Sequence, residues 1–192
     1  KFIGKENVAM ILGDNFFYGQ NLSSLLQANT KLKKGARVVL HKVLKPELFG
    51  IAKINKNKKI IKIKEKPKKF FSDLAITGLY FFDNDVVKYS KQLKPSKRGE
   101  VEIVDLLNLY KSRNRLSANL IGRGGAWLDT GSMDDFYKTS NFVSAIENRQ
   151  GLKIACLEEI SFNNKWTNKK NIKNSIKFYG NCEYSKYLAK LL

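Results

Sequence analysis

VAMILGDNFFYGQ, residues 8–20, joins an apolar run to an acidic residue. Residues 8–12 carry uninterrupted apolar side chains and are followed by Gly13, a pattern typical of a fully buried strand inside a parallel sheet. Asp14 comes next, at the carboxyl end of that strand, which is where open α/β sheets bind their ligands. The stretch therefore predicts a central strand whose end carries a functional carboxylate.

Strand and helix patterns alternate along the rest of the chain. Apolar or alternating side chains predict strands over residues 36–44, 76–82, 117–122 and 126–131, and a hairpin over 49–67. Apolar side chains at helical spacing, or capping residues, predict helices over residues 102–110, about 133–149 and about 184–192. This alternation predicts an α/β fold around a mixed, mostly parallel central sheet.

Length and composition limit the class of protein. The 192 residues, 43% of them hydrophobic, suffice for one sizeable core, so we expect a single domain over residues 1–192 with a helical C-terminal segment over about 152–192. No apolar run approaches the ~20 residues that span a bilayer, and the first residues form no cleavable signal, so a cytoplasmic protein is expected. His41 is the only histidine and the two cysteines form no Cys-x-x-Cys pair, which disfavours a zinc site.

The formal net charge of +19 raises the question of a polyanionic partner. The lysines are spread among asparagine and isoleucine, so drift in the composition of a solvated surface is the favoured reading and an anion-binding surface is the alternative. A basic nucleic-acid-binding module, the main rival function, predicts aromatic side chains interleaved with arginine. Phe16, Phe17, Tyr80 and Phe81 instead fall in predicted strands or at their ends, beside acidic residues. The sequence therefore disfavours nucleic acid as the partner.

Asp14 and Asp129 occupy similar positions in the predicted fold. Each follows an apolar strand and stands close to a glycine that lets a ligand approach the backbone. Two carboxylates that converge on one crevice suit Mg²⁺, which takes oxygen ligands and is commonly shared with substrate phosphates. The alternative for each aspartate is a turn or a helix cap, which is the commoner role of an isolated Asp-Asn or Asp-Thr-Gly.

The sequence also contains cationic side chains that suit a phosphate ligand. Lys66 follows Glu65 at the end of the predicted hairpin, and Arg98 stands beside a glycine ahead of a predicted helix. Both cations suit phosphate, and the planar guanidinium binds it with two parallel hydrogen bonds. Each charge taken singly is more often part of a solvated surface, but their order along the chain favours a phosphate compound as ligand.

Longer motifs occur in the order LGDNFFYGQ, PELFGIAKI, IIKIKEKPKKFFSDLAITGLYFFD, KPSKRGEVEIVDLLNLY, RGGAWLDTGSMDDFYKTSNFVSAIENRQGLKIACLEEISF and YSKYLAKLL. In this order they resemble glucose-1-phosphate thymidylyltransferases over essentially the whole chain. The resemblance implies a three-layer, Rossmann-like nucleotidyltransferase domain that requires Mg²⁺. It also implies that the phosphate of glucose 1-phosphate attacks the α-phosphorus of dTTP without a covalent enzyme intermediate. The products are dTDP-glucose, which supplies dTDP-rhamnose for cell-surface polysaccharide, and pyrophosphate.

The resemblance further implies roles for individual residues. Asp14 and Asp129 would hold Mg²⁺ and so form the catalytic centre. The residues that would bind the sugar phosphate are Gly50 and Glu65 at the glucose hydroxyls, Lys66, Tyr80 and Arg98 at the phosphate, and Gly78 at the floor of the pocket. Because the sugar phosphate is itself the nucleophile, catalysis would rest on positioning and charge neutralisation.

One part of the family pattern has no match in this chain. Family members open with a glycine-rich loop, G-x-G-T-R-L, that wraps the triphosphate, and nothing here resembles it. We therefore expect an N-terminally incomplete chain that is not active alone. A fragment is favoured, and a split-gene product that pairs with a missing N-terminal half, or a decayed remnant, is the alternative. A non-catalytic sugar-phosphate-binding or assembly subunit is the alternative function. The family is typically tetrameric, so a homo-oligomer is expected.

Overall fold

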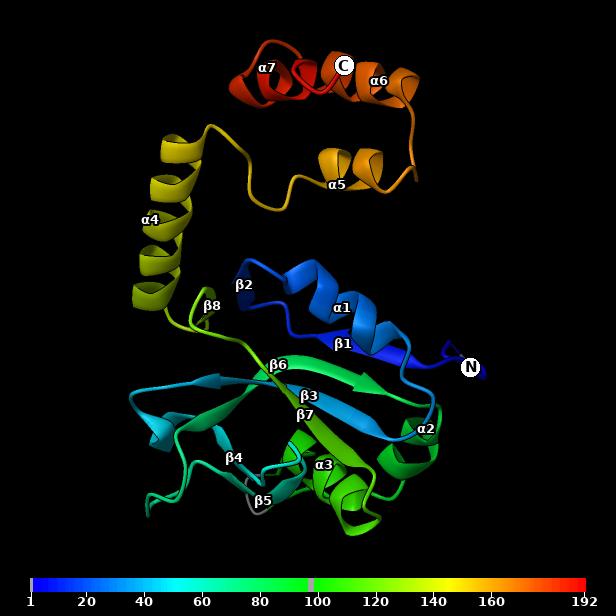
Figure 1. Cartoon of the computed structure of the whole chain (residues 1–192), viewed down its shortest axis with the longest axis vertical. Coiled ribbons are helices and arrows are strands. Elements are labelled where there is room, and N and C mark those ends of the chain that lie inside the picture. Colours follow the sequence, from blue (N-terminus) through cyan, green and yellow to red (C-terminus); the bar gives the residue numbers. More distant parts are fainter. Residues whose placement is uncertain (1, 97–98) are drawn as a thin grey trace. The chain divides into compact units, whose positions relative to one another are not determined.

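The computed structural model describes residues 2–96 and 99–192 (Figure 1). The chain forms two compact units, Lys1–Ser132 and Met133–Leu192, which are described in turn. One domain over residues 1–192 stays a prediction. No described helix combines the length and the apolar character that crossing a bilayer requires.

A six-stranded sheet forms the centre of the first unit (Figure 1). Its strands run in the order β5 (Ile60–Glu65), β4 (Gly50–Ile54), β6 (Leu74–Phe82), β3 (Ala36–Lys42) and β7 (Leu116–Leu120), and β1 (Val8–Ile11) also pairs with β6. A separate two-stranded ribbon, the β2–β8 ribbon, is made of β2 (Asn15–Gly19) and β8 (Gly125–Asp129). Every strand predicted from the sequence is present, within a few residues of its predicted bounds.

The α/β class and the mixed sheet are confirmed, but the described strand pairings are mostly antiparallel rather than mostly parallel. β3 and β7 run parallel, whereas β1, β3 and β4 each pair antiparallel with β6. β4 and β5 form the predicted antiparallel hairpin. A continuous apolar run such as that of β6 reports burial of both faces of a strand, and it does not report the direction of the neighbouring strands.

Helices cover both faces of the sheet and give the predicted three layers (Figure 1). The helices of this unit are α1 (Leu22–Thr30), α2 (Asp85–Ser90) and α3 (Ile103–Ser112). Tyr80 and Phe82 pack with α2 and α3 on one face, and Leu79 and Phe81 pack with Leu25 of α1 on the other. Since successive side chains of a strand point to opposite faces, β6 contributes to both cores.

β1 differs from the predicted fully buried central strand. Its side chains alternate between half-buried and exposed, and Ile11 is 59% exposed. Among the described strands, β6 alone pairs with β1. An apolar run predicts a strand, but it does not show whether both faces and both edges of that strand are covered.

The second unit is helical, with α4 (Met133–Gln150), α5 (Leu157–Asn163), α6 (Lys169–Tyr179) and α7 (Glu183–Ala189). Its core contains Ile172 of α6 and Leu188 of α7. The hydroxyl of Tyr184 donates to Glu158 Oε2 at 2.6 Å and tethers α7 to α5. The predicted helices over residues 133–149 and 184–192 are confirmed. α5 and α6 lie within the predicted helical segment over about 152–192, although their individual bounds were not predicted.

Candidate active site

The β2–β8 ribbon brings Asp14 and Asp129 together. Asn15 and Asp129 are opposite each other in the antiparallel register. The backbone N–H and the hydroxyl of Thr130 donate to the carbonyl oxygen of Asp14 at 2.7 and 2.8 Å. A Cβ atom added at Gly131 would lie 3.1 Å from Asp129 Oδ1 and 3.6 Å from Asp14 Oδ2. The two carboxylates therefore border the same glycine, although they are distant in the sequence.

The two carboxylates suit a shared divalent cation. Asp14 is exposed and Asp129 half-buried, and neither forms an ion pair with a described lysine or arginine. Like charges close together disfavour each other, and a cation relieves that repulsion. No group of three or more His, Cys, Asp or Glu suited to a metal occurs within residues 2–96 and 99–192. The pair therefore fits Mg²⁺, which is usually bound by one or two carboxylates together with waters and substrate phosphates.

The side-chain amide of Asn15 connects Asp14 to the central sheet. Its Oδ1 accepts hydrogen bonds from the backbone N–H of Gly78 at 3.0 Å and from Trp127 Nε1 at 2.5 Å. Its Nδ2 donates to Asp14 Oδ1 at 2.8 Å. Asn15 and Trp127 were not among the predicted site residues. Two features of the sequence could have identified Asn15. It directly follows a predicted metal ligand, and Gly78 stands inside a buried strand, where a glycine often marks the close approach of another group.

Gly78 lies where two strands share one edge of β6. β3 pairs along the opposite edge, whereas on this edge β1 pairs with residues 79–82 and β4 with residues 74–75. Between these two pairings, the carbonyl of Gly78 accepts from the backbone N–H of Leu12 at 2.9 Å, and its N–H donates to Asn15. A Cβ atom at Gly78 would lie only 2.6 to 2.7 Å from the amide atoms of Asn15. Glycine thus makes room for that amide, and a place at the floor of a sugar pocket stays a prediction.

Gly50, Glu65 and Lys66 form a second group at one end of the β4–β5 hairpin. Gly50 and Glu65 are opposite each other in the register, and a Cβ atom at Gly50 would lie 2.9 Å from Glu65 Oε2. The backbone N–H of Lys66 donates to the carbonyl of Phe49 at 3.0 Å. Lys66 has a φ of 37°, a left-handed conformation that non-glycine residues adopt rarely and that concentrates at functional sites.

An open cavity of about 800 Å³ lies beside this second group. Its polar lining includes Glu65, Lys66, Ser96, Glu102, Asp105 and Asn108. The lining therefore offers carboxylates that accept hydrogen bonds from hydroxyls and an ammonium group that pairs with an anion. Such a combination suits a ligand that carries both hydroxyl groups and negative charge.

The pKa of Tyr80 is affected by charges from both groups of site residues. Burial raises the pKa of Tyr80 well above its usual range, and the negative charges of Glu65 and Asp14 raise it further. Its hydroxyl therefore stays protonated at neutral pH and remains a hydrogen-bond donor. Its contact with a phosphate stays a prediction. Arg98, the second predicted phosphate ligand, lies outside the described residues.

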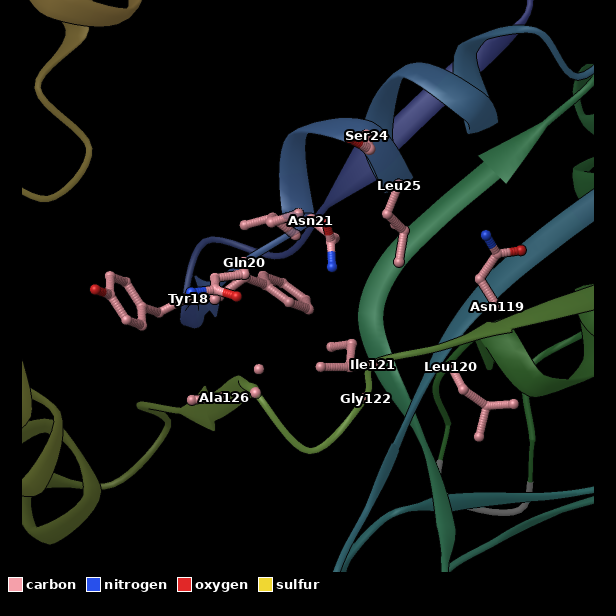
Figure 2. A pocket seen from close by; sticks show the side chains of 15 residues that line it. Tyr18, Gln20, Asn21, Ser24, Leu25, Asn119, Leu120, Ile121, Gly122 and Ala126 are labelled. Carbon is pink, nitrogen blue, oxygen red and sulfur yellow. The ribbon is translucent and has the colours of Figure 1, made fainter.

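A separate cavity of about 550 Å³ lies at the other end of the β2–β8 ribbon (Figure 2). Figure 2 shows Asn21 and Leu25 on the side of α1, with Ile121 and Ala126 across the cavity from them. The ribbon ends here with Gly19 opposite Gly125, whereas Asn15 and Asp129 are paired at its opposite end. The cavity is therefore distinct from the space beside the two carboxylates.

The chain is similar to known nucleotidyltransferases over its whole length. The glucose-1-phosphate thymidylyltransferase of Neisseria meningitidis serogroup A is 43% identical over 100% of this chain and 67% of its own length. That of Mycobacterium tuberculosis strain H37Rv is 35% identical over 99% of this chain and 66% of its own length. The chain thus spans about two thirds of these curated relatives.

Solved structures share the fold. A crystal structure described as a glucose-1-phosphate thymidylyltransferase from Bacillus anthracis in complex with sucrose is 41% identical, with a TM-score of 0.64, over 73% of this chain and 56% of that one. Apo UDP-glucose pyrophosphorylase is 25% identical, with a TM-score of 0.65, over 77% of this chain and 57% of that one. The profile of the nucleotidyl transferase family matches residues 1–146. The chain therefore belongs to the nucleotidyl transferase family.

Proposed function

We propose that the chain supplies the metal-binding and sugar-phosphate-binding residues of a glucose-1-phosphate thymidylyltransferase. In this reaction the phosphate of glucose 1-phosphate attacks the α-phosphorus of dTTP, which forms dTDP-glucose and releases pyrophosphate. The observation that carries the proposal is that the fold brings the expected residues together in two groups, one beside Gly131 and one at the end of the β4–β5 hairpin. Asp14 and Asp129 form one group, and Gly50, Glu65 and Lys66 form the other.

The first group would hold Mg²⁺ through the carboxylates of Asp14 and Asp129. When bound, the ion supplies positive charge that stabilises the reacting phosphates and orients them. The two carboxylates, which border Gly131, would hold that charge. Because the sugar phosphate is the nucleophile, the chain has only to position the reactants and neutralise their charge.

The second group would bind glucose 1-phosphate. Glu65 would accept hydrogen bonds from the sugar hydroxyls, while Gly50, which has no side chain, lets the sugar approach the backbone. Lys66 would pair with the phosphate, with Arg98 as a second cation. Tyr80, whose hydroxyl stays protonated, would donate to the same phosphate.

The product and the setting of the reaction are also proposed. dTDP-glucose would supply dTDP-rhamnose for cell-surface polysaccharide, and the reaction would take place in the cytoplasm. The chain would act within a homo-oligomer, or with a partner chain that supplies triphosphate-binding residues. The names of the relatives, which cover essentially the whole chain, support the sugar nucleotide as product.

Two assays test the proposed function. Calorimetry measures binding of glucose 1-phosphate to the purified chain. A coupled assay measures pyrophosphate released from dTTP and glucose 1-phosphate by the native protein, that is, the protein as it occurs in the cell with any partner chain. We expect binding in the first and Mg²⁺-dependent release in the second. Binding without release would favour a non-catalytic sugar-phosphate-binding subunit. A chain that does not bind glucose 1-phosphate would contradict the proposal.

Lys66→Ala is expected to weaken binding of glucose 1-phosphate by about ten- to a hundredfold, because a charge-assisted contact contributes about 1.5–3 kcal/mol. Calorimetry on the purified chain measures the change. Lys53→Ala is the matched control, since it removes the same charge from an exposed position of β4 outside the cavity lining. Equal affinities of the two variants would show that Lys66 does not contact the phosphate.

Gly50→Ala is expected to weaken binding of glucose 1-phosphate by about tenfold while the free energy of unfolding changes by less than about 1 kcal/mol. The new Cβ would lie 2.9 Å from Glu65 Oε2, at the far end of a flexible side chain, so we expect the carboxylate to shift and the backbone to keep its position. Calorimetry and urea unfolding measure the two effects. Gly122→Ala, where nothing lies within 4 Å of the added atom, is the control. Unchanged affinity in Gly50→Ala would exclude the role of this pair.

A further inference from the structure

The amide of Asn15 can adopt only one orientation. Both groups that face its Oδ1, the backbone N–H of Gly78 and Trp127 Nε1, are donors without any acceptor capacity. A flipped amide would point its own N–H groups at these two donors and would leave all of them unsatisfied. Nδ2 is therefore directed to the carboxylate of Asp14, to which it donates at 2.8 Å.

The indole of Trp127 is itself held in place. Trp127 is 8% exposed and packs with Ile51 and Ala75. Its ring meets that of Phe49 edge to face, with the ring centroids 5.2 Å apart. A rigid indole that donates to Asn15 thus fixes the amide from the side of the central sheet.

Trp127 also joins the two groups of site residues. Its Nε1 reaches Asn15, which contacts Asp14, and its ring touches Phe49, whose carbonyl accepts from the backbone N–H of Lys66. A shift of the indole would therefore change the positions of the carboxylates and of Lys66 together. Trp127 stands two residues before Asp129 in the same strand, β8.

We propose that Asn15 and Trp127 are positioning residues that hold the carboxylate of Asp14 in the orientation that binds a divalent cation. The inference rests on the proposed function, because that function assigns Asp14 to the metal. Hydrogen bonds from neighbouring groups orient metal ligands, and their loss typically costs about ten- to a hundredfold in metal affinity or activity. Trp127 acts through Asn15, and Asn15 acts through Asp14.

The test is binding of Mn²⁺ to the purified chain, measured from the electron paramagnetic resonance signal of the free ion. Asn15→Ala is expected to weaken binding by about tenfold or more. Trp127→Phe keeps an aromatic ring but removes the N–H donor, so a smaller loss in the same direction is expected while Gly78 still holds Oδ1. Trp166→Phe, at a residue 75% exposed, is the control and is expected to bind as the wild type does.

The hydrogen bond from Trp127 Nε1 to Asn15 can be followed directly by nuclear magnetic resonance. The chain has two tryptophans, so its indole N–H signals in a ¹H–¹⁵N spectrum are assigned by Trp127→Phe and Trp166→Phe. Asn15→Ala is expected to shift the Trp127 signal, because its acceptor is removed. Unchanged Mn²⁺ affinity in both Asn15→Ala and Trp127→Phe would overturn the inference, even if the native protein releases pyrophosphate. Weakened Mn²⁺ binding without pyrophosphate release would support the inference and contradict the proposed function instead.

Discussion

Asp129→Asn is expected to lower the turnover of dTTP and glucose 1-phosphate by about a thousandfold, because a bound metal ion contributes several kcal/mol of charge stabilisation to such a reaction. Asparagine has the shape of aspartate, and its Oδ1 can still accept from the backbone N–H of Gly131, a contact of 2.9 Å in the wild type. The loop is therefore retained and only the negative charge is lost. Pyrophosphate release by the native protein measures the effect.

A second measurement separates loss of the metal from loss of the fold. Asp129→Asn is expected to lose most of its Mn²⁺ binding, while its thermal unfolding midpoint stays close to that of the wild type. Asp134→Asn is the control, since Asp134 is an exposed residue of α4 whose partner is Lys138. Near-normal turnover and Mn²⁺ binding in Asp129→Asn would show that this carboxylate does not hold the metal.

The positions of every strand except β2 and of three helices, α3, α4 and α7, could be predicted because they depend on local patterns. Apolar runs and hairpin alternation located β1 and β3 to β8 within a few residues. α1 was not predicted, because its large apolar side chains, Leu22, Leu25 and Leu26, span little more than one helical turn and give only a short amphipathic signal. The strand directions were not predictable either, since burial of both faces does not depend on the direction of a neighbour.

The candidate site shows the same division between local and tertiary information. The convergence of Asp14 and Asp129 was predicted, because both stand at the ends of strands, and the register of the β2–β8 ribbon places them together. Asn15 and Trp127 were not predicted. Their importance depends on Gly78, which lies in a third strand, and no local pattern reports that the three residues meet.

Asp83→Ala is expected to lower the free energy of unfolding of the first unit by about 3–5 kcal/mol, the usual cost of removing one partner of a buried ion pair. Asp83 is 5% exposed and pairs with Arg115. It also accepts from the backbone N–H of Gly35 at 2.5 Å and from the hydroxyl of Tyr110 at 2.8 Å. Burial raises the pKa of Tyr110, and its hydrogen bond to Asp83 raises it further, so the hydroxyl stays a donor, and alanine removes the carboxylate that accepts from it.

Asp85→Ala provides the matched control for this loss. Asp85 pairs with the same guanidinium of Arg115 at 2.7 Å, but its side chain is 45% exposed, so solvent screens the pair and its loss is expected to cost less than about 1 kcal/mol. Urea unfolding followed by fluorescence of Trp127 in a Trp166→Phe background reports on the first unit, because Trp127 is then the only tryptophan. If Asp83→Ala and Asp85→Ala destabilise the unit equally, neither burial nor the additional hydrogen bonds of Asp83 determine the contribution of these aspartates. A difference of at least about 2 kcal/mol is expected, since only Asp83 also satisfies Gly35 and Tyr110.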